Sequence, residues 1–274
     1  MNKERSNLQI IAGPCGLENR HTAEQTIFEA ERSGIDTIRM NLWKPRTRSS
    51  YDGLGETGLP LVREAAESGL NVAMEVMLPE HVEQLKQEVL AYANDVALLL
   101  WIGSRNQNHL VQRQIAAAVK GIDHIKLMIK NQPWREMKHW AGIVSHVQDE
   151  GLPNEQLLLC HRGFAPWDKE RSELRNIPDL PMAEQIKSEL QLPMILDPSH
   201  MGGAVHLVKQ LARDFIDCDW VDGLMIEVHP CPEQALTDGQ QQLTWEELRS
   251  LLAVRSKQRV PRSRAKPVKE RAVV

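Results

Sequence analysis

The chain has 274 residues, of which 42% are hydrophobic, and its formal net charge at pH 7 is −4. This length suits one large α/β domain. The chain lacks both an apolar run long enough to span a membrane and an apolar N-terminal leader, which argues against a transmembrane or secreted protein. We therefore expect a cytoplasmic protein that does not contact membranes. The four cysteines are well separated and have no CxxC spacing, which excludes a disulfide framework or a zinc ribbon.

The charge is unevenly distributed along the chain. Residues 255–274, the C-terminal tail, hold eight Lys and Arg against one acidic residue, so the tail carries +7 and residues 1–254 carry −11. An acidic body of this kind is a poor ligand for nucleic acid. The tail contains two prolines and no apolar periodicity, which predicts a disordered or loosely docked extension. Docking to an anionic partner is the alternative.

Short apolar runs alternate with amphipathic stretches along residues 1–254. The apolar runs are residues 8–13, 36–40, 71–76, 97–103, 124–130, 156–163, 192–197 and 223–229. The clearest amphipathic stretches are residues 22–34, 59–69, 79–93 and 203–215. Gly34, Gly69 and Gly151 stand where helix C-caps belong. Near-continuous apolar strands separated by helices indicate a parallel sheet covered on both faces.

Eight such units over about 250 residues predict a single-domain (β/α)8 TIM barrel formed by residues 1–254. A doubly wound open sheet is the alternative, but it usually has fewer strands, and no GxGxxG follows the first run. Residues 164–182 form a long connection after the sixth run, of the kind that folds over an active site.

Charged residues follow every predicted strand, at the end where barrel enzymes have their active sites. One group is cationic: Arg39, Lys44, Arg46, Arg105, Lys130 and Arg162. These cations would repel one another unless anions compensate them. Guanidinium groups bind phosphate and carboxylate bidentately, so the group predicts a substrate with several negative charges and more than one phosphate. The alternative for any one of them is a salt bridge to a neighbouring acid.

A second group at the same strand ends combines thiol, imidazole and carboxylate side chains: Cys15, His200, Glu227 and Asp238. This mixture suits a borderline divalent ion such as Mn²⁺, Fe²⁺, Co²⁺ or Zn²⁺. Such an ion can act as a Lewis acid on a carbonyl group. The alternatives are that Cys15 is a small buried hydrophobic residue and that His200 caps a helix. Their spacing is not a known metal motif, and only the barrel brings them together.

Several of these segments are found together in one family. They are AGPC (12–15), Arg39 with WKPRT (43–47), GLG (53–55), GSR (103–105), IK (129–130), HRG (161–163), DPSH (197–200) and IEVHP (226–230). In this combination the chain resembles the class I 3-deoxy-D-arabino-heptulosonate 7-phosphate (DAHP) synthases, the entry enzymes of the shikimate pathway. The match covers about residues 8–252, in order. It is closest to the short microbial branch, some members of which carry a fused chorismate mutase.

The resemblance implies a role for each group. Arg46 and Thr47 are expected to bind the phosphate of erythrose 4-phosphate, with Lys44 lying between the two substrates. Arg105, Lys130 and Arg162 are expected to bind phosphoenolpyruvate, with a contribution from Arg39. The implied metal ligands are Cys15, His200, Glu227 and Asp238, and the implied catalytic residues are Lys44, Lys130 and His200.

The implied reaction is an aldol-like condensation in which C3 of phosphoenolpyruvate attacks the aldehyde carbon of erythrose 4-phosphate. Water then adds at C2, and phosphate leaves with cleavage of its C–O bond. The cations hold two mutually repelling anions at bonding distance, which is mainly a positioning task. No Schiff base is needed, so Lys130 is given an electrostatic role.

Two other functions compete with this one. The related 3-deoxy-manno-octulosonate 8-phosphate synthases use arabinose 5-phosphate, but they have an Asn-rich segment where this chain has KPRT. A catalytically idle barrel that serves as a binding or regulatory subunit is the other alternative. This alternative is supported by four residues that depart from the family pattern: Gly16, Ser104, Gln132 and His161. None of these departures removes a predicted metal ligand or substrate-binding cation.

Regulation and assembly are predicted only in outline. The residues outside the barrel are too few for a chorismate mutase helix bundle, which takes on the order of 80 residues, so we expect no intrinsic feedback domain. The tail is expected to be a docking segment or a vestigial linker whose deletion leaves catalysis intact. The resemblance implies a homodimer or homotetramer.

Overall fold

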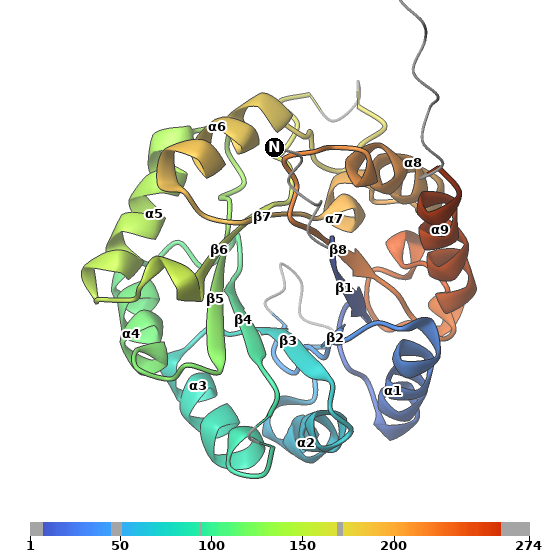
Figure 1. Ribbon diagram of the computed structural model, residues 1–274, viewed down its shortest axis with the longest axis horizontal. Coiled ribbons are helices and arrows are strands. Elements are labelled where there is room, and N and C mark those ends of the chain that lie inside the picture. The colour runs from blue at the N-terminus through green and yellow to red at the C-terminus, as the bar shows by residue number, and fades with distance from the viewer. Residues whose placement is uncertain (1–7, 45–50, 94, 169–171, 259–274) are drawn as a thin grey trace, which may run out of the picture.

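The structure is a computed structural model that describes residues 8–44, 51–93, 95–168 and 172–258. Eight parallel strands form a closed barrel in the order of the sequence, and helices surround it (Figure 1). The strands are β1 (Gln9–Gly13), β2 (Thr37–Arg39), β3 (Asn71–Glu75), β4 (Leu98–Ile102), β5 (Ile125–Lys130), β6 (Leu157–His161), β7 (Met194–Leu196) and β8 (Gly223–Glu227). The predicted TIM barrel is thereby confirmed.

Pairing between the first and last strands closes the barrel. Residues Gln9 to Gly13 of β1 align with Gly223 to Glu227 of β8 in parallel register. An open doubly wound sheet would leave two edge strands, so this pairing excludes it. Each strand lies inside one of the eight apolar runs of the sequence. The runs are nearly continuous because every strand is covered by side chains inside the barrel and by helices outside it.

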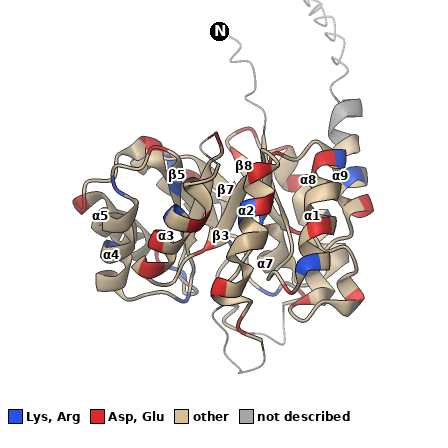
Figure 2. Cartoon of the chain, turned by 90° about the horizontal axis from the view of Figure 1, so that it is seen from below, with Lys and Arg blue, Asp and Glu red and all other residues tan. Residues whose placement is uncertain are grey.

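The helices around the barrel are α1 (Arg20–Ser33), α2 (Leu59–Glu67), α3 (Pro79–Leu85), α4 (His109–Val119), α5 (Met137–Asp149), α6 (Leu180–Leu190), α7 (Pro198–Gly202), α8 (Val205–Ile216) and α9 (Trp245–Gln258). A π-helical turn, Lys86–Leu90, extends α3. Figure 2 shows acidic and basic positions scattered over the outer helices. Among the described residues, no helix has the length and apolar character that a membrane span requires.

Strand β4 shows how one apolar run serves two cores. Leu98, Leu100 and Ile102 pack outward, in the large cluster between the strands and the helices. Leu99 and Trp101 point inward, in a smaller cluster that fills the barrel. Alternation along a strand accounts for this division. The interior of the barrel is therefore filled with side chains, so a substrate has room to bind at the ends of the barrel and not inside it.

Local signals in the sequence set the ends of the helices. The Asn19 side chain accepts a hydrogen bond from the Thr22 amide and caps α1, which ends at Gly34 with a left-handed φ of 65°. Asp197 caps the short α7 by accepting from the His200 amide at 3.0 Å. This cap places His200 directly above the end of β7, at the C-terminal end of the barrel.

Candidate active site

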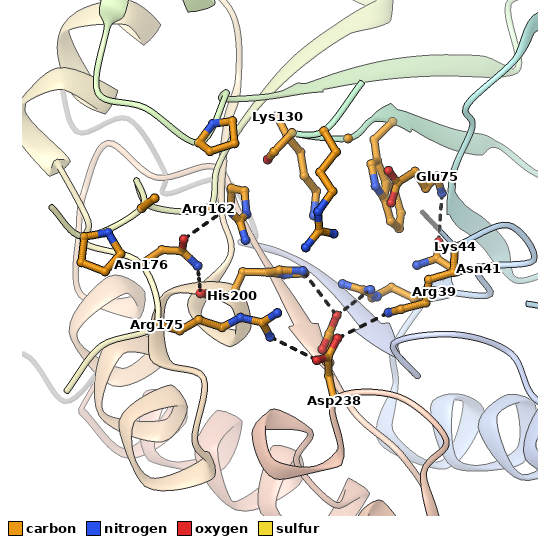
Figure 3. A pocket seen from close by; sticks show the side chains of 18 residues that line it. Arg39, Asn41, Lys44, Glu75, Lys130, Arg162, Arg175, Asn176, His200 and Asp238 are labelled. Carbon is orange, nitrogen blue, oxygen red and sulfur yellow. Dashed lines mark hydrogen bonds and ion pairs between the residues drawn. The ribbon is translucent and has the colours of Figure 1, made fainter. Parts of the chain in front are cut away.

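A cavity of about 480 Å³ opens at the C-terminal end of the barrel (Figure 3). Its walls include eight of the residues singled out from the sequence: Arg39, Lys44, Arg105, Lys130, Arg162, His200, Glu227 and Asp238. Arg46 and Thr47 lie outside the described residues. The barrel therefore brings five of the six predicted cations and three of the four proposed metal ligands to one cavity.

Two of the cations have counter-ions inside the protein. Arg39 Nη2 lies 3.0 Å from Glu227 Oε1, and Lys130 Nζ lies 2.9 Å from Asp197 Oδ2. All four side chains are almost completely buried. Burial alone would lower the pKa of Arg39, but nearby Glu227 raises it. The salt-bridge alternative therefore applies to Arg39 and Lys130, although both also line the cavity.

Arg162 differs from these two cations. No carboxylate among the described residues forms an ion pair with it; its Nη1 instead lies 3.3 Å from the Asn176 amide oxygen. Burial lowers the pKa of Arg162 to about 10, and the attraction of Asp197 opposes this only in part. A partly buried guanidinium without a carboxylate partner at a cavity wall favours the binding of an anion. The cavity is the space where such an anion fits.

Asp197 links the cationic group to His200. Its Oδ2 lies 2.9 Å from Lys130 Nζ and 2.8 Å from His200 Nδ1. Burial would raise the pKa of Asp197, but His200 and Lys130 hold it well below its usual range. Burial lowers the pKa of His200 to about 4, against the opposing effects of Asp197 and Glu227. His200 is therefore neutral at pH 7, with Nδ1 next to the Asp197 carboxylate.

The four predicted metal ligands stand in two pairs. Cys15 Sγ lies 3.4 Å from Asp238 Oδ2, and His200 Nε2 lies 3.9 Å from Glu227 Oε1. The Lys44 ammonium contacts the Cys15 thiol and lies 3.6 Å from Asp238 Oδ2. Across the part of the chain that is described, no three His, Cys, Asp or Glu side chains are grouped closely enough to hold a metal ion.

The donor set nevertheless fits a divalent ion in its chemistry. Thiol, imidazole and two carboxylates suit a borderline metal. His200 is neutral and has Nδ1 beside the Asp197 carboxylate, and a neighbouring carboxylate is a common feature of metal-binding histidines. Burial and the charge of Glu227 raise the pKa of Cys15 to about 12, so the thiol keeps its proton in this arrangement. Metal binding would have to displace that proton.

Several cavity residues were not singled out from the sequence. Arg175 and Asn176 come from the connection after β6, and Asn41 follows β2. Asn41 donates to the Cys15 carbonyl and accepts from the Glu75 amide, both at 2.9 Å, and so ties three strand ends together. The sequence signal for Arg175 and Asn176 was their place in the long connection that was expected to fold over the site.

The four departures from the family pattern lie at different distances from the cavity. Ser104 lines the cavity, and a Cβ at Gly16 would lie 3.4 Å from Lys44 Cδ. His161 is fully buried and accepts from the Asp179 amide at 2.9 Å. Gln132 donates to the carbonyls of Trp134 and Glu136. The last two side chains hold loops together rather than line the cavity.

Fold and cavity together define a (β/α)8 barrel with a cation-rich pocket for anionic substrates at its C-terminal end. The chain belongs to the DAHP synthetase I family, whose model matches residues 3–261. It is 33% identical to a phospho-2-dehydro-3-deoxyheptonate aldolase of Thermotoga maritima, over 89% of this chain and 67% of that protein.

A second curated relative belongs to the octulosonate branch. It is a 2-dehydro-3-deoxyphosphooctonate aldolase of Nitratidesulfovibrio vulgaris, 30% identical over 89% of both chains. Among solved structures, the crystal structure of the Thermotoga maritima DAHP synthase superposes with a TM-score of 0.79 at 30% identity. That match covers 92% of this chain and 69% of the other.

Proposed function

We propose that the chain condenses phosphoenolpyruvate with erythrose 4-phosphate to give DAHP and inorganic phosphate, the first step of the shikimate pathway. The observation that carries this proposal is the Arg162 guanidinium, partly buried and without a carboxylate partner among the described residues, at the wall of a cavity that also holds Arg39, Arg105 and Lys130. Family membership supplies the reaction, and the cavity supplies a place for its anions.

Phosphoenolpyruvate is assigned to the inner part of the cavity. Lys130 and Arg39 lie over the Trp101 ring, with Nζ at 4.9 Å and Cζ at 5.3 Å from its centroid. Their charges are held in place by Asp197 and Glu227, so they need no rearrangement when the substrate binds. Arg162 and Arg105 complete the set of cations for the carboxylate and phosphate of this substrate.

Erythrose 4-phosphate is assigned to the side of the cavity next to Lys44. Arg46 and Thr47, to which the family motif gives the role of binding the phosphate of this sugar, lie outside the described residues. The flanking backbone is held in place, because the Lys44 amide donates to Asp52 O at 2.9 Å and the Gly55 amide donates to Leu42 O at 3.0 Å. These two bonds hold described residues on either side of the motif.

Cys15, His200, Glu227 and Asp238 would hold a divalent ion, with Mn²⁺, Fe²⁺, Co²⁺ and Zn²⁺ as the candidates. When bound, the ion supplies a Lewis acid for the aldehyde carbonyl of the sugar. Lys44 contacts Cys15 and Asp238, and it carries a proton at Nζ. We assign this proton to the alkoxide oxygen that forms when C3 of phosphoenolpyruvate bonds to the aldehyde carbon.

The remaining cations act by position and charge. Arg105, Lys130 and Arg162 hold phosphoenolpyruvate while water adds at C2, and they stabilise the departing phosphate as its C–O bond breaks. Asp197 keeps Lys130 charged and His200 oriented. A cytoplasmic location remains a prediction from the sequence, and assembly as a homodimer or homotetramer remains a prediction from the family resemblance.

The octulosonate 8-phosphate synthase reaction is the second candidate, because such enzymes are among the relatives. What favours erythrose 4-phosphate is the KPRT sequence at residues 44–47, where the octulosonate enzymes have an Asn-rich segment. The two reactions share phosphoenolpyruvate and differ in the sugar, so the sugar decides between them.

Purified protein stripped by a chelator and resupplied with Mn²⁺ tests the proposal. Loss of phosphoenolpyruvate absorbance is followed with erythrose 4-phosphate in one cuvette and arabinose 5-phosphate in another. Metal-dependent consumption with the four-carbon sugar alone is expected. Consumption with the five-carbon sugar would move the assignment to the octulosonate reaction. Consumption with neither, by folded protein that binds Mn²⁺, would favour the idle barrel.

A further inference from the structure

Arg175 reaches the predicted ligand group from the connection after β6. A single nitrogen, Nη1, lies 3.3 Å from Asp238 Oδ1 and 2.5 Å from Gln241 Oε1 (Figure 3 shows the contact with Asp238). The stem of the side chain is also held, because Arg175 Cβ fills the space beside Gly203, where an added Cβ would approach it to 2.6 Å. Arg175 is therefore built into the cavity wall.

Gln241 extends this contact to the second carboxylate. Its amide nitrogen donates to Glu227 Oε2 at 2.6 Å, while its amide oxygen accepts from Arg175. Gln241 is fully buried, as is Glu227. Because both ends of the amide are bound, its orientation is fixed: oxygen toward the cation and nitrogen toward the carboxylate. One guanidinium thus reaches Asp238 directly and Glu227 through one amide.

We propose that Arg175 and Gln241 are positioning residues that set the separation and direction of the Asp238 and Glu227 carboxylates for metal binding. This inference rests on the proposed function, because it assigns these carboxylates to a divalent ion. Neither residue is a ligand itself. They act as the hydrogen-bonded outer layer that orients ligating side chains in metal sites.

The backbone of Asp238 makes such support necessary. Asp238 has a left-handed φ of 49°, and its side chain is one-fifth exposed, whereas Glu227 lies inside strand β8 and is completely buried. A carboxylate on an irregular loop has more freedom than one on a strand. Arg175 holds the carboxylate on the loop, and Gln241 connects it to the carboxylate on the strand.

The same segment also reaches the phosphoenolpyruvate side. Asn176, the next residue, accepts from Arg162 Nη1 at 3.3 Å and donates to the His200 carbonyl at 2.5 Å. Two consecutive residues therefore contact the Asp238 carboxylate, the His200 backbone and the anion-binding guanidinium. The long connection after β6 contributes to the site through these contacts.

Mn²⁺ binding to chelator-stripped protein tests the proposal without any turnover. The variants are Arg175→Gln, Gln241→Leu and the double substitution, and free Mn²⁺ is counted by electron paramagnetic resonance. Arg249→Gln is the matched control, because Arg249 is 31% exposed and pairs with Glu29, much as Arg175 is 33% exposed and pairs with Asp238. Thermal unfolding of the metal-free proteins shows whether each variant folds.

Each single variant is expected to weaken Mn²⁺ binding by about 10- to 100-fold. The double variant should lose little more than the worse single variant, because the two residues act in one chain of contacts. The control should bind like the unaltered protein. Arg175→Lys, which keeps a cation on this side, should recover part of the loss.

The outcomes separate this inference from the proposed function. If the unaltered protein does not bind Mn²⁺, the metal assignment fails, and this inference fails with it. If the unaltered protein binds Mn²⁺ and the folded Arg175 and Gln241 variants bind it equally well, only the positioning role is overturned. Independent, additive losses in the two single variants would contradict the connected arrangement.

Discussion

Asp197 contacts Lys130 and His200 at once, with distances of 2.9 Å and 2.8 Å from the same oxygen, Oδ2. It also caps α7 through its other oxygen, Oδ1. One buried carboxylate therefore fixes a substrate-binding cation, the histidine of the predicted metal site and the helix that carries that histidine. Asp197 and His200 stand three residues apart in the DPSH segment, whereas Lys130 comes from β5.

Replacing Asp197 by Asn tests this role. The variant leaves the Lys130 charge buried without a counter-ion, so the free energy of unfolding should fall by about 3–5 kcal/mol, as when one partner of a buried pair is removed. Urea denaturation measures the change. Glu64→Gln is the control, because it breaks the exposed contact with Arg20 and should leave the unfolding curve in place. Equal curves for Asp197→Asn and the parent protein would contradict the role.

Gly53 and Gly55 offer a matched pair in the loop next to Lys44. Both have positive φ, but an added Cβ would approach Leu42 O to 1.9 Å at Gly53 and would meet nothing within 4 Å at Gly55. Gly55→Ala should therefore cost only the left-handed backbone term, about 1–2 kcal/mol.

Gly53→Ala should cost more, because the Leu42 carbonyl it displaces accepts the Gly55 amide. A further loss of about 1–3 kcal/mol is expected from the clash, together with weaker binding of erythrose 4-phosphate. Thermal unfolding and titration calorimetry measure the two effects. Equal stability of the two alanine variants would contradict this expectation and would show that the backbone at Gly53 shifts to accommodate the added Cβ.

Arg162 is expected to lower the stability of the substrate-free protein and to be required for binding phosphoenolpyruvate. Arg162→Met removes a partly buried guanidinium that has no ion pair among the described residues, so the substrate-free protein should be as stable as its parent or more stable. The KM for phosphoenolpyruvate should rise at least about 30-fold, as expected when one side of a buried charge pair is removed. Steady-state kinetics and urea denaturation test the two halves. A marked loss of stability with an unchanged KM would assign Arg162 to the fold alone.

His161 should give the protein a pH-dependent stability. Burial lowers its pKa to about 3 in the folded chain, against about 6.5 for an unfolded histidine. The unfolded chain therefore takes up a proton as the pH falls below 6.5, while the folded chain does not until about pH 3. The stabilising contribution is complete above pH 6.5 and is lost progressively on acidification.

His161→Gln should reduce the slope of unfolding free energy against pH, between pH 6 and pH 4, by about 1.4 kcal/mol per pH unit. The slope should not vanish, because burial also lowers the pKa of His81, to about 4. Urea denaturation at a series of pH values measures it. A slope identical to that of the parent protein would show that His161 takes up its proton in the folded state.

The barrel was predictable because its signals are local and repeated. Each strand is an apolar run, and several helices begin or end at a residue that favours a cap, such as Asn19 or Gly34, so one misread segment would not have changed the predicted architecture. The cations at the strand ends were also predictable, since chain direction alone places them at one end of the barrel. The open-sheet alternative is removed only by the pairing of β1 with β8, which no local signal specifies.

The pairing of side chains across the cavity was not predictable in the same way. Whether Lys130 meets a substrate or Asp197 depends on rotamers and on register between strands, not on the order of residues. The two pairs formed by Cys15 with Asp238 and by His200 with Glu227 are of this kind. Arg175 was missed because it lies in the middle of a connection, where no strand end marks it.

The identity of the sugar is the central claim, and a competition experiment tests it most directly. Protein resupplied with Mn²⁺ is given phosphoenolpyruvate and equal concentrations of erythrose 4-phosphate and arabinose 5-phosphate, and the products are identified by mass spectrometry. We predict a seven-carbon 3-deoxy sugar phosphate as the main product. An eight-carbon product in equal or greater amount would contradict the assignment of the Lys44 side of the cavity to erythrose 4-phosphate.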